Sequence, residues 1–324
     1  MIISRTPLRI TLGGGGTDIP SFYETHGEGF LVAAAIDKYI YVAVHDNFEP
    51  EYLLKYSAIE KSADLEAIKH PIIRECLRLY GVPASVEVSS IADIPAGTGL
   101  GSSGTFTVGM LRSLAGYRRQ LVSNAELAAQ ACHIEIDTLR EPVGKQDQYI
   151  AALGGLTSLT FRGDGTVEAQ SVNMPQRAME ELQDNLLLFY TGVRRSASDE
   201  LQELSDTVAR PSSRMSANLT DVRQAGHLAQ DLLQSGSLVE FASLLTDQWR
   251  LKFDRSPSRI HEEIDELIQA GLAAGAQGGK LVGAGGGGFL LFYAESKLRL
   301  REVMADRGLR EVKFRFDFQG TTVL

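Results

Sequence analysis

The chain has 324 residues and a formal net charge of −9, with 44% hydrophobic and 23% charged residues. This is the composition of a globular protein with a sizeable core, and it excludes an intrinsically disordered chain, a fibrous repeat and a disulfide scaffold. The acidic balance gives no electrostatic footprint for nucleic acid, so an anionic ligand must be held by a local group of donors.

The first half of the chain alternates strand and helix patterns. Residues 2–12 predict a strand that leads into four consecutive glycines, and residues 30–36 and 39–45 predict a strand pair with a turn at 37–38. Apolar residues at helical spacing predict a helix over 64–80. Further expected elements are a strand at 85–88, a loop over 91–103, helices over 104–120 and 125–140, a helix that ends at Gly154, and a strand at 156–161.

A stretch without periodicity, residues 171–181, contains Pro175 and predicts a domain boundary. We therefore expect one domain over residues 1–175 and a second over residues 176–324. The second half is expected to contain strands at 186–190, 281–282, 289–293 and 312–318, and helices over 198–209, 213–233, from 238 onward and over 260–272. Because strands and helices are mixed in both halves, the sequence predicts the α+β class.

Two features bear on where the protein works. Cys76 and Cys132 lie far apart and form no C-x-x-C pair, which is typical of a reducing compartment. The first residues show no signal-peptide pattern, and the longest apolar run, residues 30–36, is far shorter than a membrane span. We therefore expect a cytoplasmic protein with neither a membrane nor a nucleic acid as partner, either a monomer or a homodimer.

A glycine-rich loop, residues 95–104, stands between a predicted strand and a predicted helix. Its alternating glycines let backbone N–H groups converge on an anion, and the N-terminus of the following helix adds further donors. Ser102 and Ser103 can cap that helix and offer hydroxyls to a phosphate or a metal ion. The expected nucleotide-binding residues are Pro95, Gly97, Gly99, Leu100, Gly101, Ser102, Ser103 and Gly104.

The same loop also matches a second nucleotide motif. Residues 99–104 read G-x-G-x-x-G, the dinucleotide fingerprint, so a nicotinamide-dependent dehydrogenase is one alternative. That fingerprint belongs on the first strand of its fold, with an acidic residue about 20 positions on. Here Asn124 occupies that distance, which counts against this alternative.

Three motifs together resemble those of the GHMP kinases, the group of galactokinase, homoserine kinase, mevalonate kinase and phosphomevalonate kinase. Residues 95–103 resemble the ATP-binding motif, residues 7–18 the first motif, and residues 280–289 the third, glycine-rich motif. They follow one another in the order of the family and span nearly the whole chain. The resemblance implies a ribosomal-protein-like N-terminal domain, a ferredoxin-like C-terminal domain, and phosphoryl transfer that uses ATP and Mg²⁺.

The resemblance also implies roles for single residues. It places Ser103 and Glu135 at Mg²⁺, and a hydroxyl and a carboxylate suit this oxygen-preferring ion. Asp147 then lies at the attacking hydroxyl, as the base or as an orienting group, and Arg9 is the cation that keeps it ionised. Asp18 corresponds to a ligand of sugar hydroxyls in galactokinase-like members.

The first motif further points to a substrate class. Its Gly-Gly-Gly-Thr-Asp form, residues 14–18, lacks the Glu-His pair of galactokinase and is similar to bacterial D-glycero-D-manno-heptose 7-phosphate kinases. The resemblance implies phosphorylation of the anomeric hydroxyl to the 1,7-bisphosphate, for nucleotide-activated heptose and surface polysaccharide such as lipopolysaccharide or capsule. A fucose kinase, another sugar kinase and a sugar sensor without catalysis are the alternatives.

A phosphorylated sugar in an acidic protein requires a basic pocket. Candidates for the contact with the substrate phosphate are Lys145, Arg194, Arg195 and Lys252. The complete set of expected substrate-binding residues is Gly14, Gly15, Gly16, Thr17, Asp18, Lys145, Gly285, Gly286 and Arg194.

Overall fold

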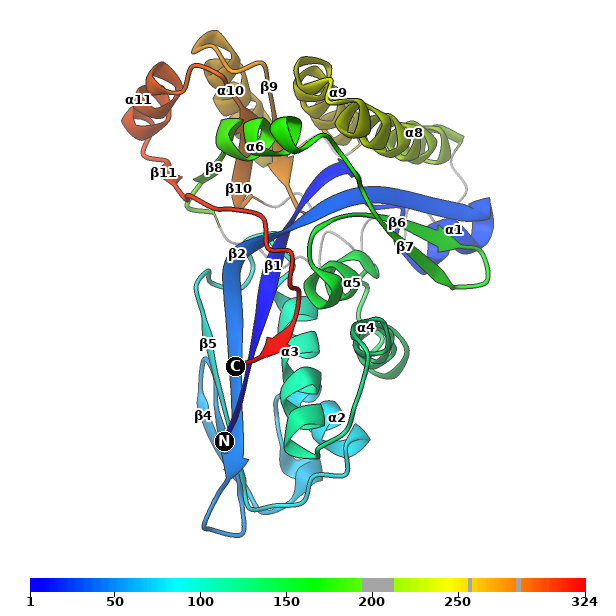
Figure 1. Ribbon diagram of the computed structural model, residues 1–324, viewed down its shortest axis with the longest axis vertical. Helices are drawn as coiled ribbons and strands as arrows, with labels where there is room; N and C mark the ends of the chain where they lie inside the picture. The colour runs from blue at the N-terminus through cyan, green and yellow to red at the C-terminus, as the bar shows by residue number, and fades with distance from the viewer. Residues whose placement is uncertain (194–212, 256–257, 284–286) are drawn as a thin grey trace.

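The computed structural model describes residues 1–193, 213–255, 258–283 and 287–324, arranged as two β-sheets covered by helices (Figure 1). The first part of the chain forms β1 (Ile2–Gly14), α1 (Pro20–His26), β2 (Glu28–Asp46), β3 (Tyr52–Lys55), β4 (Ile59–Ser62), the 3₁₀ turn η1 (Leu65–Ala67), α2 (Pro71–Leu79), β5 (Val86–Ala92), α3 (Ser102–Tyr117), α4 (Asn124–Cys132), the π-helical segment η2 (His133–Thr138), α5 (Gln146–Leu153), β6 (Leu156–Arg162) and β7 (Val167–Ser171).

The remainder forms α6 (Gln176–Asn185), β8 (Leu186–Tyr190), α8 (Ser213–Ser235), α9 (Leu238–Arg255), α10 (Arg259–Ala273), β9 (Gly278–Val282), β10 (Phe289–Tyr293), α11 (Leu298–Asp306), β11 (Arg310–Glu311) and β12 (Thr322–Val323). Both halves mix strands and helices, so the expected α+β class is confirmed. The helix expected over 198–209 lies outside the described residues.

The first sheet has eight strands, in the order β12-β1-β2-β5-β3-β4, with β6 paired to β2 and β7 paired to β6. α3 packs against the first half of β1 and α8 against its end, which is why β1 is buried over most of its length. The last strand, β12, pairs with β1 and brings the two chain ends close together (Figure 1). The first and the last strand of the chain are therefore neighbours in the first sheet.

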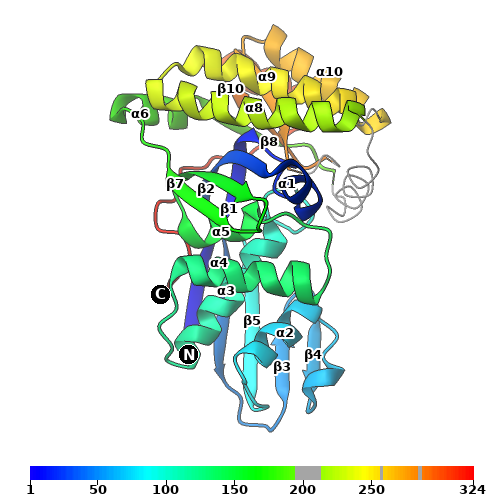
Figure 2. The same ribbon diagram turned by 90° about the vertical axis from the view of Figure 1, so that its right-hand side faces the viewer.

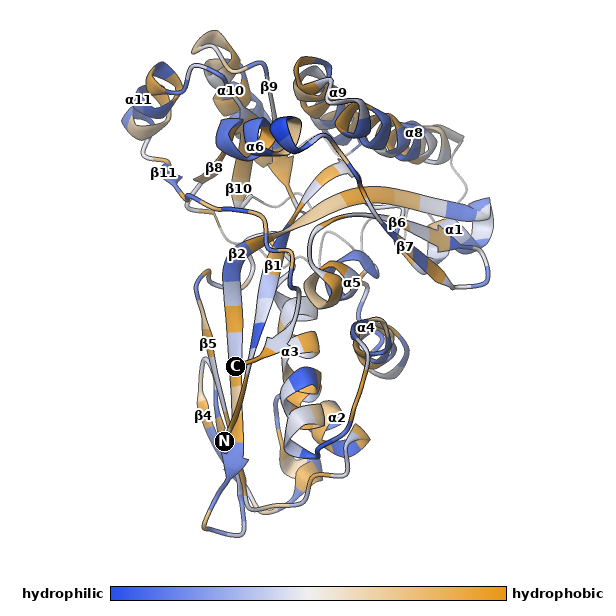
Figure 3. Cartoon of the chain, in the orientation of Figure 1, coloured by the Kyte–Doolittle hydropathy of each residue, from blue (hydrophilic) through white to orange (hydrophobic). Residues whose placement is uncertain are grey.

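The second sheet has four antiparallel strands in the order β11-β8-β10-β9. β10 is apolar and buried along its whole length, as expected for a strand covered on both faces. α8 and α9 run across this end of the molecule (Figure 2), and Figure 3 shows hydrophobic strands beneath the mostly hydrophilic α6. Among the helices of the described chain, none has the length and apolarity to cross a membrane.

The division of the chain at residue 175 stays a prediction. Contacts cross it, because α8 packs on β1 and β2, and β12 adds a strand to the first sheet. α8 approaches β1 closely at Gly13, where a side chain would place its Cβ 2.3 Å from Cβ of Ala229. Glycine at this position lets α8 approach the strand end that leads into the glycine run.

The turn expected at 37–38 is wrong, because β2 continues without interruption from Glu28 to Asp46. The register against β1 shifts between Pro7 and Leu8, and this bulge absorbs the two residues. Asp37 is held there by Arg315, whose carbonyl accepts the Asp37 N–H at 2.9 Å and whose N–H donates to the Asp37 carboxylate at 2.9 Å. The contact with Arg315 thus holds Asp37 and Lys38 in the strand, although their sequence is typical of a turn.

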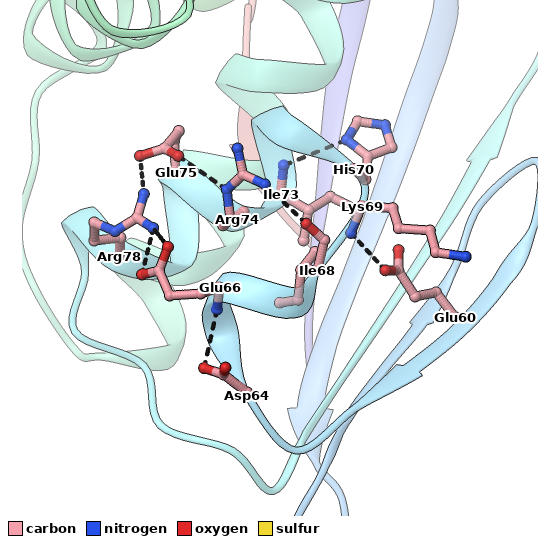
Figure 4. A network of polar contacts seen from close by, with 10 residues as sticks. All are labelled: Glu60, Asp64, Glu66, Ile68, Lys69, His70, Ile73, Arg74, Glu75 and Arg78. Atoms are coloured by element: carbon pink, nitrogen blue, oxygen red, sulfur yellow. Dashed lines mark hydrogen bonds and ion pairs between the residues drawn. The ribbon is translucent and has the colours of Figure 1, made fainter.

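The helix expected over 64–80 is also wrong as a single element, because it is split into η1 and α2. Pro71 has no N–H to continue the first piece, and it begins α2 instead. His70 caps α2, with Nδ1 accepting the N–H of Ile73 at 3.4 Å. Figure 4 shows the exposed ion pair between Arg78 and Glu66, 2.7 Å, that joins the two pieces.

The alternating strand expected over 312–318 forms no ladder. Beyond β11, the described chain makes only an isolated bridge there, between Phe316 and Ile36. The alternation of burial holds in part, since Phe314 and Phe316 are buried whereas Phe318 is 60% exposed. The alternation of apolar and polar residues therefore reflects packing of this segment on the core, and the segment does not form a sheet strand.

Candidate active site

A cavity of about 670 Å³ is lined by residues from both halves of the sequence. The glycine loop before α3, the end of β1 and the start of α5 form its walls together with α9 and β9. The polar and charged side chains around its glycine-lined part are Arg9, Thr11, Asp18, Ser102, Ser103, Glu141, Gln146, Asp147, Gln248, Lys252, Arg255 and Lys280. Sequence positions more than 250 residues apart therefore meet in one space.

Arg9 is the centre of this arrangement. It is 4% exposed, and its Nε and Nη2 lie 2.7 Å and 2.6 Å from Oδ1 of Asp147. Its Nη1 donates to the Gly99 carbonyl at 2.7 Å, and its backbone N–H donates to the Leu100 carbonyl at 3.1 Å. Arg9 thus holds the glycine loop and Asp147 beside each other. Asp147 lines the cavity, and both side-chain contacts that Arg9 makes with it are to Oδ1.

The glycine loop has the backbone geometry of an anion cradle. Gly97, Gly99 and Gly101 have φ values of 76°, 80° and 81°, which residues with a Cβ rarely adopt. Gly101 is the N-cap of α3, so the serines that follow do not cap the helix, contrary to the expectation. The Ser102 hydroxyl is instead buried without a partner among the described residues, at a helix N-terminus. A phosphate oxygen there would satisfy it.

The second glycine motif packs directly on this loop. A Cβ at Gly99 would lie 2.9 Å from the Val282 carbonyl oxygen, and one at Gly283 would lie 2.5 Å from Cα of Gly99. Further along, a Cβ at Gly288 would lie 2.1 Å from the Thr98 carbonyl oxygen. Glycine is required on both sides because two backbones touch here. Part of this motif, including the predicted substrate ligands Gly285 and Gly286, lies outside the described residues.

Glu135 lies behind the loop, fully buried in the π-helical segment η2. The Ser103 hydroxyl donates to its Oε1 at 2.5 Å, and the Gln148 amide donates to its Oε2 at 2.7 Å. Burial raises the pKa of Glu135 to about 7. Ser103 lines the cavity and Glu135 does not, so the carboxylate supports the hydroxyl from the interior. The structure brings the two predicted metal ligands together.

Asp18 is buried and lies two residues after the glycine run, residues 13–16, at the end of β1. Its Oδ1 accepts the N–H of Gly16 at 3.0 Å and its Oδ2 that of Gln146 at 3.4 Å. Burial and the neighbouring carboxylate of Asp147 raise the pKa of Asp18. A Cβ at Gly144 would lie 1.9 Å from Oδ2, so glycine is needed to seat the carboxylate. Gly14, Gly15 and Gly16, all at positive φ, line the cavity with it.

Other predicted residues do not line the cavity. Lys145 donates to the Gly165 carbonyl at 2.6 Å and lies 5.2 Å from the centre of the Tyr23 ring. Thr17 is buried and exchanges two hydrogen bonds of 3.1 Å with the backbone of Phe30. Pro95, Leu100 and Gly104 belong to the loop but are absent from the cavity wall. Arg194 and Arg195 lie outside the described residues.

The structure adds site residues that sequence reasoning missed. Gln248 of α9 donates to the Leu12 carbonyl at 3.1 Å and accepts the Gly14 N–H at 3.1 Å, which ties the second half to the end of β1. Nothing in its sequence surroundings singles it out. The cavity is also lined by aromatic and aliphatic residues from separate segments, which suit a flat apolar ligand, namely Tyr56, His70, Ile72, Ile94 and Phe106.

Comparisons with known proteins agree with this geometry. The family model described as the GHMP kinases N terminal domain matches residues 66–155, and the model of the GHMP kinases C terminal domain matches residues 229–307. The D-glycero-alpha-D-manno-heptose 7-phosphate kinase of Campylobacter jejuni is 26% identical over 99% of this chain and 96% of its own length. The L-fucokinase/L-fucose-1-P guanylyltransferase of Bacteroides fragilis is 26% identical over 94% of this chain but only 36% of its own length.

Solved structures show the same fold. A D-glycero-D-manno-heptose 1-phosphate kinase from Bacteroides thetaiotaomicron has a TM-score of 0.79, with 23% identity over 100% of this chain and 99% of that one. The galactokinase of Lactococcus lactis in complex with galactose has a TM-score of 0.78, with 16% identity over 100% of this chain and 95% of that one. The two-domain fold expected from the sequence is thereby confirmed.

The burial of Glu135 predicts a pH-dependent cost in stability when no metal ion is present. Its carboxyl is protonated in both the folded and the unfolded chain at low pH, but between about pH 4.5 and pH 7 only the folded chain keeps the proton. Stability should therefore fall as pH rises through this window, by about 3 kcal/mol relative to Glu135→Gln. Urea denaturation of both proteins in EDTA at pH 5 and pH 8 measures the difference.

Glu180→Gln, on the exposed surface of α6, is the matched control and should follow the wild type. Equal pH dependence of the wild type and Glu135→Gln would show that burial does not perturb this carboxyl.

Proposed function

This chain belongs to the GHMP kinase family and is a sugar kinase, and from that premise we propose its reaction: transfer of a phosphoryl group from ATP to the anomeric hydroxyl of D-glycero-D-manno-heptose 7-phosphate, giving the 1,7-bisphosphate. The observation that carries the reaction type is Arg9, which joins Asp147 to the Gly99 carbonyl of the phosphate cradle. The heptose kinase of Campylobacter jejuni, similar over 99% of the chain, supports the acceptor.

The residues present fit ATP and Mg²⁺. The buried Ser102 hydroxyl and the N-terminus of α3 offer unsatisfied donors to phosphate. The Ser103 hydroxyl lines the cavity and is offered to Mg²⁺ directly, and the buried Glu135 carboxylate that is hydrogen-bonded to it would add its negative charge from the interior side. Within the described chain no cluster of three or more His, Cys, Asp or Glu could hold a metal by itself, which agrees with an ion shared with phosphates. ATP would supply the transferring phosphoryl group, and Mg²⁺ would neutralise its charge.

The protein residues then have separate tasks. Asp18 accepts hydrogen bonds from hydroxyls of the sugar. Because its carboxylate is held between Gly16 and Gly144, it fixes the position of the sugar ring relative to Asp147. Oδ2 of Asp147 orients the attacking hydroxyl and receives its hydrogen, while Oδ1 stays bonded to Arg9. The Arg9 guanidinium offsets the charge that develops near the glycine loop. The apolar part of the cavity, with Tyr56 and Phe106, receives the nucleotide base.

We further place this enzyme in the cytoplasm, in the supply of nucleotide-activated heptose for surface polysaccharide. Its two cysteines are free and buried, as in proteins of a reducing compartment. Fucose is the second candidate acceptor, because the similarity to the L-fucokinase/L-fucose-1-P guanylyltransferase of Bacteroides fragilis covers 94% of this chain.

The substrate proposal is tested by ATP consumption with Mg²⁺ on heptose 7-phosphate, mannose 6-phosphate, fucose, galactose and mevalonate. We expect the highest kcat/KM on heptose 7-phosphate. Preferred turnover of fucose would keep the family and the site but replace the acceptor. Tight sugar binding with no ATP consumption would identify a sensor, and preference for NADH over ATP would overturn the nucleotide assignment.

Asp147→Asn tests the role of the carboxylate at the acceptor. The substitution keeps the size of the side chain but removes the charge that faces the hydroxyl, so kcat should fall by roughly 10²–10⁴-fold. The affinity for ATP, measured by equilibrium titration, should stay within about threefold. Asp137→Asn, at an exposed residue paired with His133, is the control and should be as active as wild type. Unchanged turnover in Asp147→Asn would remove Asp147 from the mechanism.

Ser103→Ala tests the metal site. Loss of the hydroxyl that contacts Glu135 should raise the Mg²⁺ concentration for half-maximal activity by about 10-fold or more, at saturating ATP. Ser171→Ala, at the exposed end of β7, should leave the Mg²⁺ titration unchanged. Superimposable Mg²⁺ titrations of Ser103→Ala and wild type would exclude coordination through this hydroxyl.

A further inference from the structure

One face of α9 carries a row of polar residues into the cavity. Gln248, Lys252 and Arg255 are spaced i, i+4 and i+7, so they lie on the same side of the helix, and all three line the cavity. Gln248 contacts the end of β1 through Leu12 and Gly14. With a rise of 1.5 Å per residue, Arg255 lies about 10 Å further along the helix axis.

Arg255 has a buried hydrogen-bond donor without an acceptor among the described residues. Its Nη1 is buried and makes no hydrogen bond among the described residues. Burial alone lowers the pKa of Arg255 to about 10, with no nearby carboxylate acting against it. A helix C-terminus favours a cation through the helix dipole, but this does not account for a guanidinium that is shielded from water and lines a cavity. An unpaired buried donor is costly, and an anionic ligand would remove that cost.

Lys280 adds positive charge beside this row. It is 5% exposed, and its Nζ donates to Gln248 at 3.1 Å and to the Leu12 carbonyl at 3.2 Å, both uncharged partners. Burial, together with the charges of Lys252 and Arg9, lowers the pKa of Lys280 to about 7. In a protein of net charge −9, this part of the cavity therefore concentrates cations, and a bound anion would stabilise them.

We propose that Arg255 binds the phosphate of the sugar substrate that does not react, in the cavity that Lys252, Lys280 and Asp147 also line. The proposal rests on the proposed function for the identity of the sugar. It differs from the sequence expectation, which named Lys252 but not Arg255, and which also named Lys145, a residue that faces Gly165 and Tyr23.

The experiment compares wild type, Arg255→Met, Arg255→Lys and the control Arg250→Met, which removes an exposed arginine of the same helix that pairs with Asp247. Steady-state kinetics give KM for heptose 7-phosphate, KM for ATP and kcat. Arg255→Met should raise KM for the sugar phosphate by about 30-fold or more, with KM for ATP within twofold and kcat little changed. Arg255→Lys should restore part of the affinity, and Arg250→Met should match wild type.

A second measurement uses the unphosphorylated heptose. Wild type should strongly prefer the phosphorylated sugar in kcat/KM, and Arg255→Met should lose most of that preference because it lacks the phosphate partner. Thermal melts report folding. If Arg255→Met does not fold, the comparison is made with Arg255→Lys, which keeps the charge and still should raise KM for the sugar phosphate several-fold.

The outcomes separate the two proposals. If wild type turns over heptose 7-phosphate and Arg255→Met leaves its KM unchanged, or raises KM for ATP instead, the Arg255 assignment is overturned and the proposed function stands. If wild type rejects the heptose phosphate but uses mannose 6-phosphate, the proposed function fails, and Arg255 is judged on mannose 6-phosphate against mannose. If wild type uses only neutral sugars, both fail.

Discussion

The buried guanidinium of Arg9 is the constraint on which the site depends. A cation that is 4% exposed must find acceptors inside the protein, and it finds them in Asp147 and in the Gly99 carbonyl. These acceptors come from α5 and from the loop before α3, so satisfying one side chain fixes three elements relative to one another. The same buried guanidinium therefore positions the proposed base, Asp147, and the proposed phosphate cradle.

Close contacts between glycine backbones fix the two halves of the sequence relative to each other, as Arg9 does within the first half. The contacts of Gly283 with Gly99 and of Gly288 with Thr98 leave no room for a Cβ, so these two glycines pack on the glycine loop backbone to backbone. Gln248 then ties α9 to the end of β1. A cavity built in this way has walls whose positions depend on backbone contacts.

These two kinds of contact explain how far the sequence could predict the molecule. Motifs with an intrinsic chemistry were found from sequence, and the structure brings Arg9 and Asp147, and also Ser103 and Glu135, together as expected. The turn at 37–38 was wrong because Arg315, far along the chain, decides the local conformation. The role of Arg255 could not be foreseen, because its burial depends on tertiary packing and its sequence position at a helix end is ordinary.

Burial raises the pKa of Asp18 and Glu135 and lowers that of Lys280, so on both sides the ligand-free protein disfavours the charged forms. A Mg²⁺ ion near Glu135 and a phosphate near Lys280 would each restore the charged form. The site is thus organised so that its own ionisable groups gain their charge partners from the ligands. In the proposed reaction, Mg-ATP and a phosphorylated sugar would supply these charge partners, so the charges of both ligands would contribute to their binding.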